Sequence, residues 1–221
     1  LRLRGVRLRE FEGAAIASVV PPLTEVLREA VRLITDHDAL VVGAGVKTGL
    51  NIGIDDPSQM GADLVAGAVA ALDAHSPPVI IIDMGTATTI TVIGPNSRLL
   101  GGAILPGAAV SLEALSGAAS LLPRISLEAP KRAIGSGTIE CMKSGAVFGA
   151  ACAIDGMIDR MEAELGGKAA LIATGGLAER IIPYCRHDIE IDDYMLLRGL
   201  SLIWQRNHRE RRRETKQAPH A

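Results

Sequence analysis

Aromatic side chains are scarce in this sequence. Its 221 residues include only two Phe, two Tyr and one Trp, whereas 48% of the residues are hydrophobic. Proteins that bind single-stranded nucleic acid stack the bases on aromatic side chains, so this composition argues against such a platform. The chain is long and apolar enough to bury a substantial core, which must be built from aliphatic side chains and close backbone contacts.

The sequence also lacks an excess of one charge, a cysteine framework and a long apolar run. The formal net charge is -2, so no overall field favours nucleic acid or a membrane surface. Three cysteines, Cys141, Cys152 and Cys185, form no CxxC or Cys/His pattern, as expected for reduced thiols. No uninterrupted apolar run reaches the roughly 20 residues that cross a bilayer. We therefore expect a cytoplasmic protein without nucleic-acid or membrane partners.

Apolar runs and turn residues predict an α/β fold. In the second half we expect strands at residues 79–83, 88–93 and 99–104, then two helices, a strand, a helix, a short strand and a final helix ending near Asn207. In the first half we expect strands at residues 13–20, 39–42 and 49–54, a helix capped by Thr24 and a helix at 58–74.

The two halves share their later elements, but only the second begins with a three-strand meander. This pattern predicts a duplicated domain: residues 1–76 would be the remainder of the first half and residues 77–207 the second half. Residues 208–221, which contain the run RERRR, are expected to be a disordered, solvated tail.

The sharpest local signal is the segment DMGTATT at residues 83–89, where an acid ends a buried strand and a glycine and hydroxyls follow. Gly85 would let a phosphate approach the backbone, the turn amides and the Thr86 hydroxyl would donate to phosphate oxygens, and Asp83 would hold a cation. An ordinary hairpin with threonines paired across its strands explains the same residues equally well.

A second candidate is Asp63, early in a helix of small residues. The helix dipole favours an acid there whatever its function, and this is the simpler explanation from the residues alone. As a general base, Asp63 would have to reach a substrate hydroxyl. Two glycine-rich turns between strand and helix, at residues 101–107 and 174–176, could line a nucleotide cleft, although such turns contain glycine for geometry alone. The sequence contains no GxxxxGK[ST] or GxGxxG motif.

Together and in this order, these motifs resemble the type III pantothenate kinases of the acetate and sugar kinase, Hsc70 and actin superfamily. The resemblance runs from about Ala17 to Asn207 and rests mainly on the Gly-x-Asp at residues 61–63 and the segment at residues 83–89. It implies a duplicated ribonuclease H-like, or actin-like ATPase, fold whose first half is incomplete. It also implies ATP-dependent phosphorylation of pantothenate to 4'-phosphopantothenate, the first step of coenzyme A biosynthesis, by a homodimer that uses Mg2+ and a monovalent cation, K+ or NH4+.

The resemblance also implies a role for individual residues. Asp63 matches the catalytic base, and Asp83 matches the ligand of the monovalent cation. The remaining matches are pantothenate contacts at Gly61, Ala62, Asp63, Leu64 and Thr138, and ATP contacts at Gly85, Thr86, Gly175 and Gly176.

Three departures from the family pattern matter. The family opens with a strand ending in Asp-x-Gly-Asn-Thr, which holds the ATP phosphates and Mg2+; this motif is absent and the chain begins at Leu1, so we expect an amino-terminally truncated copy. Leu64 stands where the family usually has an Arg that could bind the pantothenate carboxylate, and Ile54 stands where a Tyr is frequent. Two alternatives stay open: a catalytically silent relative with a regulatory or dimerising role, and a kinase of the same superfamily that acts on another small hydroxyl compound.

Overall fold

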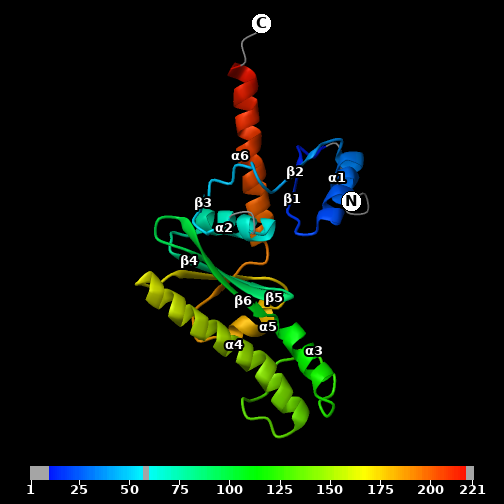
Figure 1. Cartoon of the computed structure of the whole chain (residues 1–221), viewed down its shortest axis with the longest axis vertical. Coiled ribbons are helices and arrows are strands. Elements are labelled where there is room, and N and C mark those ends of the chain that lie inside the picture. Colours follow the sequence, from blue (N-terminus) through cyan, green and yellow to red (C-terminus); the bar gives the residue numbers. More distant parts are fainter. Residues whose placement is uncertain (1–9, 57–59, 218–221) are drawn as a thin grey trace. The chain divides into compact units, whose positions relative to one another are not determined.

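The computed structural model describes residues 10–56 and 60–217 (Figure 1). The chain forms two compact units, and each is described here by itself. Unit 1 consists of Leu1–Leu50, Asp55–Asp73 and Met195–Ala221, and unit 2 consists of Asn51–Ile54 and Ala74–Tyr194.

Unit 1 contains a small parallel sheet and three helices. Strands β1 (Ala14–Ile16) and β2 (Ala39–Val41) pair in parallel, connected by helix α1 (Pro21–Thr35). The other helices are α2 (Ala62–Ala74) and α6 (Met195–Gln217). The predicted start of α2 at residue 58 lies outside the described residues.

Small residues let the helices of unit 1 approach closely. A Cβ on Gly199 of α6 would overlap the backbone carbonyl of Ala66 in α2, so the two helices touch through their backbones. This contact belongs to a core made of Val42, Ala62, Val65, Ala66, Val69 and Ile203. The excess of small aliphatic residues in the sequence is thus used for close helix packing.

Helix α1 begins earlier than the sequence suggested. Pro21 and Pro22 occupy its first positions, where the missing N–H and the fixed φ of proline fit a helix start. The Thr24 hydroxyl donates to the Val20 carbonyl at 3.2 Å rather than accepting from a first-turn amide. The prediction that Thr24 caps this helix was wrong.

Unit 2 is built on a six-stranded mixed sheet with the strand order β3-β6-β5-β4-β7-β8. Strands β4, β5 and β6 form the predicted antiparallel meander, while β7 and β8 continue in parallel beyond β4, and β3 pairs in parallel with β6. The strands are β3 (Asn51–Ile52), β4 (Val79–Met84), β5 (Ala87–Ile93), β6 (Arg98–Pro106), β7 (Ala170–Thr174) and β8 (Glu190–Ile191). The helices are α3 (Ala108–Ala118), α4 (Thr138–Leu165) and α5 (Ala178–Ile181), the last followed by a 3-10 turn at Ile182–Tyr184.

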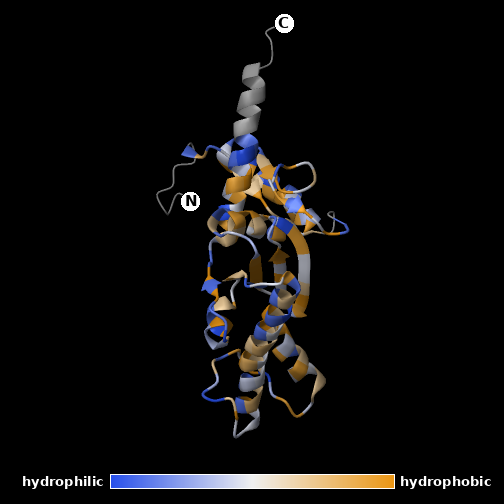
Figure 2. Ribbon diagram, turned by 90° about the vertical axis from the view of Figure 1, so that its left-hand side faces the viewer, coloured by the Kyte–Doolittle hydropathy of each residue, from blue (hydrophilic) through white to orange (hydrophobic). Residues whose placement is uncertain are grey.

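The core of unit 2 lies between one face of this sheet and its helices. Alternate residues of a strand share a face, and Ile80, Ile82 and Met84 of β4 all belong to this core. From α4 come Val147, Ala151, Ile154 and Ile158, spaced as one face of a helix requires. Figure 2 shows the sheet strands largely in the hydrophobic colour and α4 in mixed colours, as expected for a helix with one buried face.

Among the helices that the structure describes, α4 alone is long and apolar enough to cross a membrane, as judged by length and composition. That criterion is weak for one helix, since a core helix passes it too. Because α4 contributes buried residues to the core of unit 2 and carries a buried Asp155, it is the core helix of this unit.

The bounds of the two units differ from those of the predicted halves, residues 1–76 and 77–207. Strand β3 precedes residue 77 but pairs with β6 of unit 2, and α6 belongs to unit 1. Helix α6 also continues past Asn207 to Gln217, through residues of high helix propensity such as Arg, Glu, Lys and Gln. Residues 218–221 of the predicted tail lie outside the described residues, and the division into duplicated halves stays a prediction.

Candidate active site

Asp83 lies where the hydrophobic strand β4 ends. The three isoleucines before it are buried, and Asp83 itself is half-buried. It is directly paired with Thr89 of β5 and with Thr174 of β7. Opposed residues of neighbouring strands project to the same face, so the carboxylate is flanked by two threonines on the face opposite Ile82.

Gly175 brings the turn after β7 directly against Asp83. A Cβ at this position would lie 2.7 Å from Asp83 Oδ1 and equally close to the Met84 backbone, and its φ of +93 is in the left-handed region. The Leu177 N–H donates to the Met84 carbonyl at 3.1 Å and holds the same turn. Only glycine fits here without strain. Gly175 and Asp83 therefore lie in close contact.

The turn at Gly85 and Thr86 is held from two sides. The Gly85 N–H donates to the Ala87 carbonyl at 3.0 Å, and the Gly107 N–H donates to the Thr86 carbonyl at 3.0 Å. A Cβ on Gly107 would overlap that carbonyl, so the second glycine-rich turn also packs against this one. The Gly85 amide is therefore used inside the turn.

These residues suit a phosphate and a cation. Gly85, Thr86 and Gly176 are exposed, which leaves room for a phosphate, and the half-buried Asp83 carboxylate offers the oxygen ligands that hard cations take. The hairpin interpretation also holds, because Met84 and Thr88 are paired across β4 and β5. What exceeds an ordinary hairpin is the packing of two glycine turns against its tip.

Asp63 lies in unit 1, in the first turn of α2. It is half-buried, and its Oδ1 accepts the Leu64 N–H at 2.9 Å. A Cβ on Gly61 would overlap Asp63 Oδ1, so the glycine before the helix makes the space that the carboxylate occupies. Ala62 is buried in the core of unit 1 and anchors the loop, while Leu64 is half-buried. The Gly-x-Asp spacing thus has a steric reason.

Thr138 is the exposed first residue of α4 and borders a separate cavity. The cavity has a volume of about 670 Å³ and lies between α3 and the start of α4. Its lining is Ser111, Leu112, Leu115, Leu122, Gly135, Ser136, Gly137, Thr138, Cys141, Met142, Gly145 and Ala146. None of Asp83, Gly85, Thr86, Gly175 and Gly176 lines this cavity, and the contact of Thr138 with pantothenate stays a prediction. Ile54 follows β3 by two residues. It is half-buried and lies beside Gly101.

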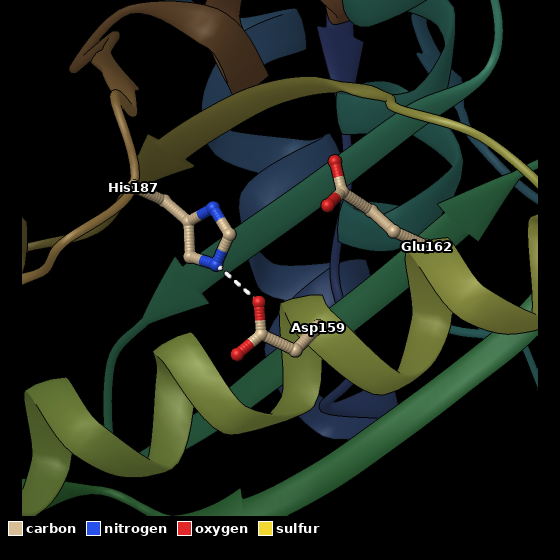
Figure 3. Close-up of side chains that lie close together, drawn as sticks. All are labelled: Asp159, Glu162 and His187. Atoms are coloured by element: carbon tan, nitrogen blue, oxygen red, sulfur yellow. Dashed lines mark hydrogen bonds and ion pairs between the residues drawn. The ribbon is translucent and has the colours of Figure 1, made fainter.

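A further polar cluster was not anticipated from the sequence. Asp159 and Glu162 of α4 lie beside His187, which precedes β8 (Figure 3). The spacing of the acids, together with Asp155 one turn earlier, is that of one helix face and could have drawn attention to them. His187 could not be assigned to this cluster from the sequence, because its contacts span about 30 residues of chain.

The fold places the chain in a class. Two solved structures superpose on most of it. One is a Baf family transcriptional activator from Campylobacter jejuni, with a TM-score of 0.64 and 22% identity, covering 91% of this chain and 87% of that one. The other is the activator of the 2-hydroxyisocaproyl-CoA dehydratase from Clostridium difficile with bound ADPNP, with a TM-score of 0.52 and 15% identity, covering 89% of this chain and 85% of that one. Both are actin-like ATPase folds, so this chain is an α/β protein of that fold.

Sequence comparison narrows the class to one family. The model of the family described as type III pantothenate kinase matches residues 2–160. The type III pantothenate kinase of Moorella thermoacetica is 42% identical over 92% of this chain and 80% of its own length, and that of Halalkalibacterium halodurans is 39% identical over the same shares. The chain belongs to the type III pantothenate kinase family, whose members are phosphotransferases of coenzyme A biosynthesis.

Proposed function

We propose that this protein transfers the γ-phosphoryl group of ATP to the primary hydroxyl of pantothenate, giving 4'-phosphopantothenate. The observation that supports this most is the 42% identity with a type III pantothenate kinase over 92% of the chain. The packing of two glycine turns around the tip of β4 agrees with a phosphate-binding role for that end of the sheet.

On the acceptor side, Asp63 takes the proton from the attacking hydroxyl. A carboxylate is suitable for this because the reaction needs a base that positions the hydroxyl as much as one that removes its proton. Gly61, Ala62, Leu64 and Thr138 contact pantothenate. With Leu64 in place of an arginine, the substrate carboxylate lacks a bidentate partner at this position.

On the nucleotide side, ATP supplies the phosphoryl group. Thr86 donates to a phosphate oxygen, and Gly85, Gly175 and Gly176 leave space for the phosphates beside the sheet. Asp83, a half-buried carboxylate flanked by threonines, holds the monovalent cation, K+ or NH4+. For Mg2+ we assign no residue of this chain, because the Asp-x-Gly-Asn-Thr motif that would hold it is absent from the sequence.

Two further properties follow from the family. We infer a homodimer, with α4 contributing to the interface, and a cytoplasmic location, as suits a metabolic kinase. The exposed apolar residues Leu115, Leu121, Ile134 and Ile139 near the start of α4 support an interface there.

The test is transfer of labelled phosphate from ATP to pantothenate, with Mg2+ and K+, by the wild-type protein and by Asp63→Asn. We expect the variant to lose turnover and keep ATP binding, because the base acts on the acceptor. Asp73→Asn, an exposed acid at the other end of α2, is the matched control and should behave as wild type. An equal loss of turnover and ATP binding in Asp63→Asn would contradict the assigned role.

Leu64 favours one alternative, a silent relative with a regulatory or dimerising role. In that case the wild-type protein would bind nucleotide without transferring phosphate to any acceptor. A panel of polyols and hydroxy acids separates this outcome from a kinase with another substrate, which would phosphorylate a different compound.

A further inference from the structure

We propose that Asp159, Glu162 and His187 form a binding site for a divalent transition-metal ion of the zinc class, in unit 2 and outside the proposed catalytic residues. One nitrogen or oxygen atom from each side chain lies within 4.8 Å of the others. The proposal does not depend on the proposed function.

Two elements supply the three ligands. Asp159 and Glu162 are three residues apart on α4 and so project from the same face of the helix. His187 comes from the segment before β8 and points toward them, with its Nε2 2.9 Å from Asp159 Oδ1 (Figure 3). A bound ion would lie between these two atoms and replace their direct contact, because each ligand atom of zinc lies about 2.0 Å from the metal.

The segment carrying His187 is fastened to α4 independently of its imidazole ring. Asp155, whose residue is 1% exposed, accepts the Arg186 N–H at 3.0 Å and the His187 N–H at 3.3 Å. Because a buried carboxylate holds these two amides, the imidazole stays beside Asp159 without help from a metal. This preorganisation lowers the entropy lost when an ion binds.

Glu162 is also fixed from outside the cluster. Its Oε1 accepts the Ala169 N–H at 3.1 Å and its Oε2 accepts from Lys168 Nζ at 2.7 Å, while its side chain is 8% exposed. Such outer partners orient metal ligands.

The donor set suits zinc. One imidazole nitrogen and two carboxylates neutralise a divalent ion, and this mixture of nitrogen and oxygen ligands is typical of Zn2+ and its neighbours in the first transition row. The Asp159 side chain is 55% exposed, so a water can complete a tetrahedral shell from the solvent side.

Two cations compete with a metal at this cluster. Lys168 contacts Glu162, and Arg186 Nη2 lies 3.6 Å from Asp159 Oδ2. The Lys168 and Arg186 side chains are 82% and 77% exposed, so each has room to turn to solvent when an ion binds. The ion would replace the contact of Lys168 with the buried Glu162, and Arg186 has a second contact, from its Nε to Asp155 Oδ2 at 3.5 Å. A purely structural ion-pair network is the competing explanation.

The experiment measures Zn2+ binding to the metal-free full chain at pH 7 by calorimetry, after the exposed thiols Cys141 and Cys152 have been alkylated. We expect one site per chain in the wild type. His187→Ala and Asp159→Asn should each weaken binding by more than about a hundredfold, which exceeds the loss of about 10–100-fold expected for a residue outside the ligand shell. Glu164→Gln, an exposed acid on the same helix outside the cluster, should bind as wild type.

Co2+ gives a second readout that is independent of stability. With Co2+ bound to the wild type we expect the visible absorption bands of a tetrahedral complex. Added Zn2+ should abolish these bands, and Asp159→Asn should not show them. Because Asp159 is half-exposed, this variant should fold even if His187→Ala does not. Absence of saturable binding, or equal binding by wild type and both cluster variants, would overturn the proposal and leave an ion-pair network.

Discussion

Gly175 is the residue on which the shape of the turn beside Asp83 depends. Its φ is +93 and a Cβ would lie 2.7 Å from the Asp83 carboxylate, so Gly175→Ala should destabilise the fold by about 1–3 kcal/mol and weaken ATP binding. Gly176 next to it has open space around it, and Gly176→Ala is the matched control. Urea unfolding of both variants checks this, and equal stabilities would contradict the steric role of Gly175.

Cys185 should be the least reactive cysteine in the protein. Burial, followed by the charge of Asp155 and the neighbouring Cys152, raises the pKa of its thiol to about 12. Since the thiolate is the reactive form, iodoacetamide at pH 8 should label the exposed Cys141 and Cys152 well before Cys185. Mass spectrometry of the labelled protein gives the order, and early labelling of Cys185 would be inconsistent with its burial.

Leu64 is the position at which substrate affinity should be adjustable. Leu64→Arg would supply a guanidinium for the pantothenate carboxylate, and a charge-assisted hydrogen bond of about 1.5–3 kcal/mol corresponds to about tenfold tighter binding or more. Titration of pantothenate into the variant measures this, with Leu64→Met as a control for size alone. Unchanged affinity would count against Leu64 as a pantothenate contact.

At the scale of elements, α4 holds the polar cluster of unit 2 together, and its stability should depend on pH. The folded state lowers the pKa of Glu162, so its contribution to the free energy of unfolding is present above the unfolded value near 4.5 and is lost as the pH falls through the lower folded value. The stability difference between wild type and Glu162→Gln should therefore shrink as the pH falls below about 4.5. A stability difference for Glu162→Gln that stays constant with pH would refute the linkage.

Long elements were predictable, and short ones were less so. The predicted bounds of α4 agree with the structure because glycines flank it: Gly137 precedes its first residue, and Gly166, with a φ of +72, ends it. The strand predicted at residues 49–54 is only Asn51–Ile52, since its pairing with β6 depends on a partner distant in sequence. A two-residue strand contains too little pattern to fix its own length.

The same distinction applies to the candidate site. The tip of β4 could be predicted because an acid, a glycine and a threonine are adjacent in the sequence and follow a buried strand. The roles of Gly107 and Asp155 could not, because each acts through backbone groups of a distant segment. The chemical groups of a turn come from neighbouring residues, whereas packing depends on which segments the fold brings together.

At the scale of the whole molecule, the association state is the property most open to test. If α4 contributes to a dimer, replacing Ile139, which is 49% exposed near its start, by Asp should shift the sedimentation coefficient from dimer to monomer. Leu33→Asp alters a residue of unit 1 that is 79% exposed and serves as the control. A dimer that survives Ile139→Asp would place the interface elsewhere.

The chain passes between its two units at residues 50–51, 54–55, 73–74 and 194–195. No single cut can therefore separate the two units from each other: a gene fragment that stops before Met195 keeps all of unit 2 but deprives unit 1 of the helix that packs on Ala66. A stop codon just before Met195 should thus leave unit 1 unable to fold, even though most of the reading frame is translated.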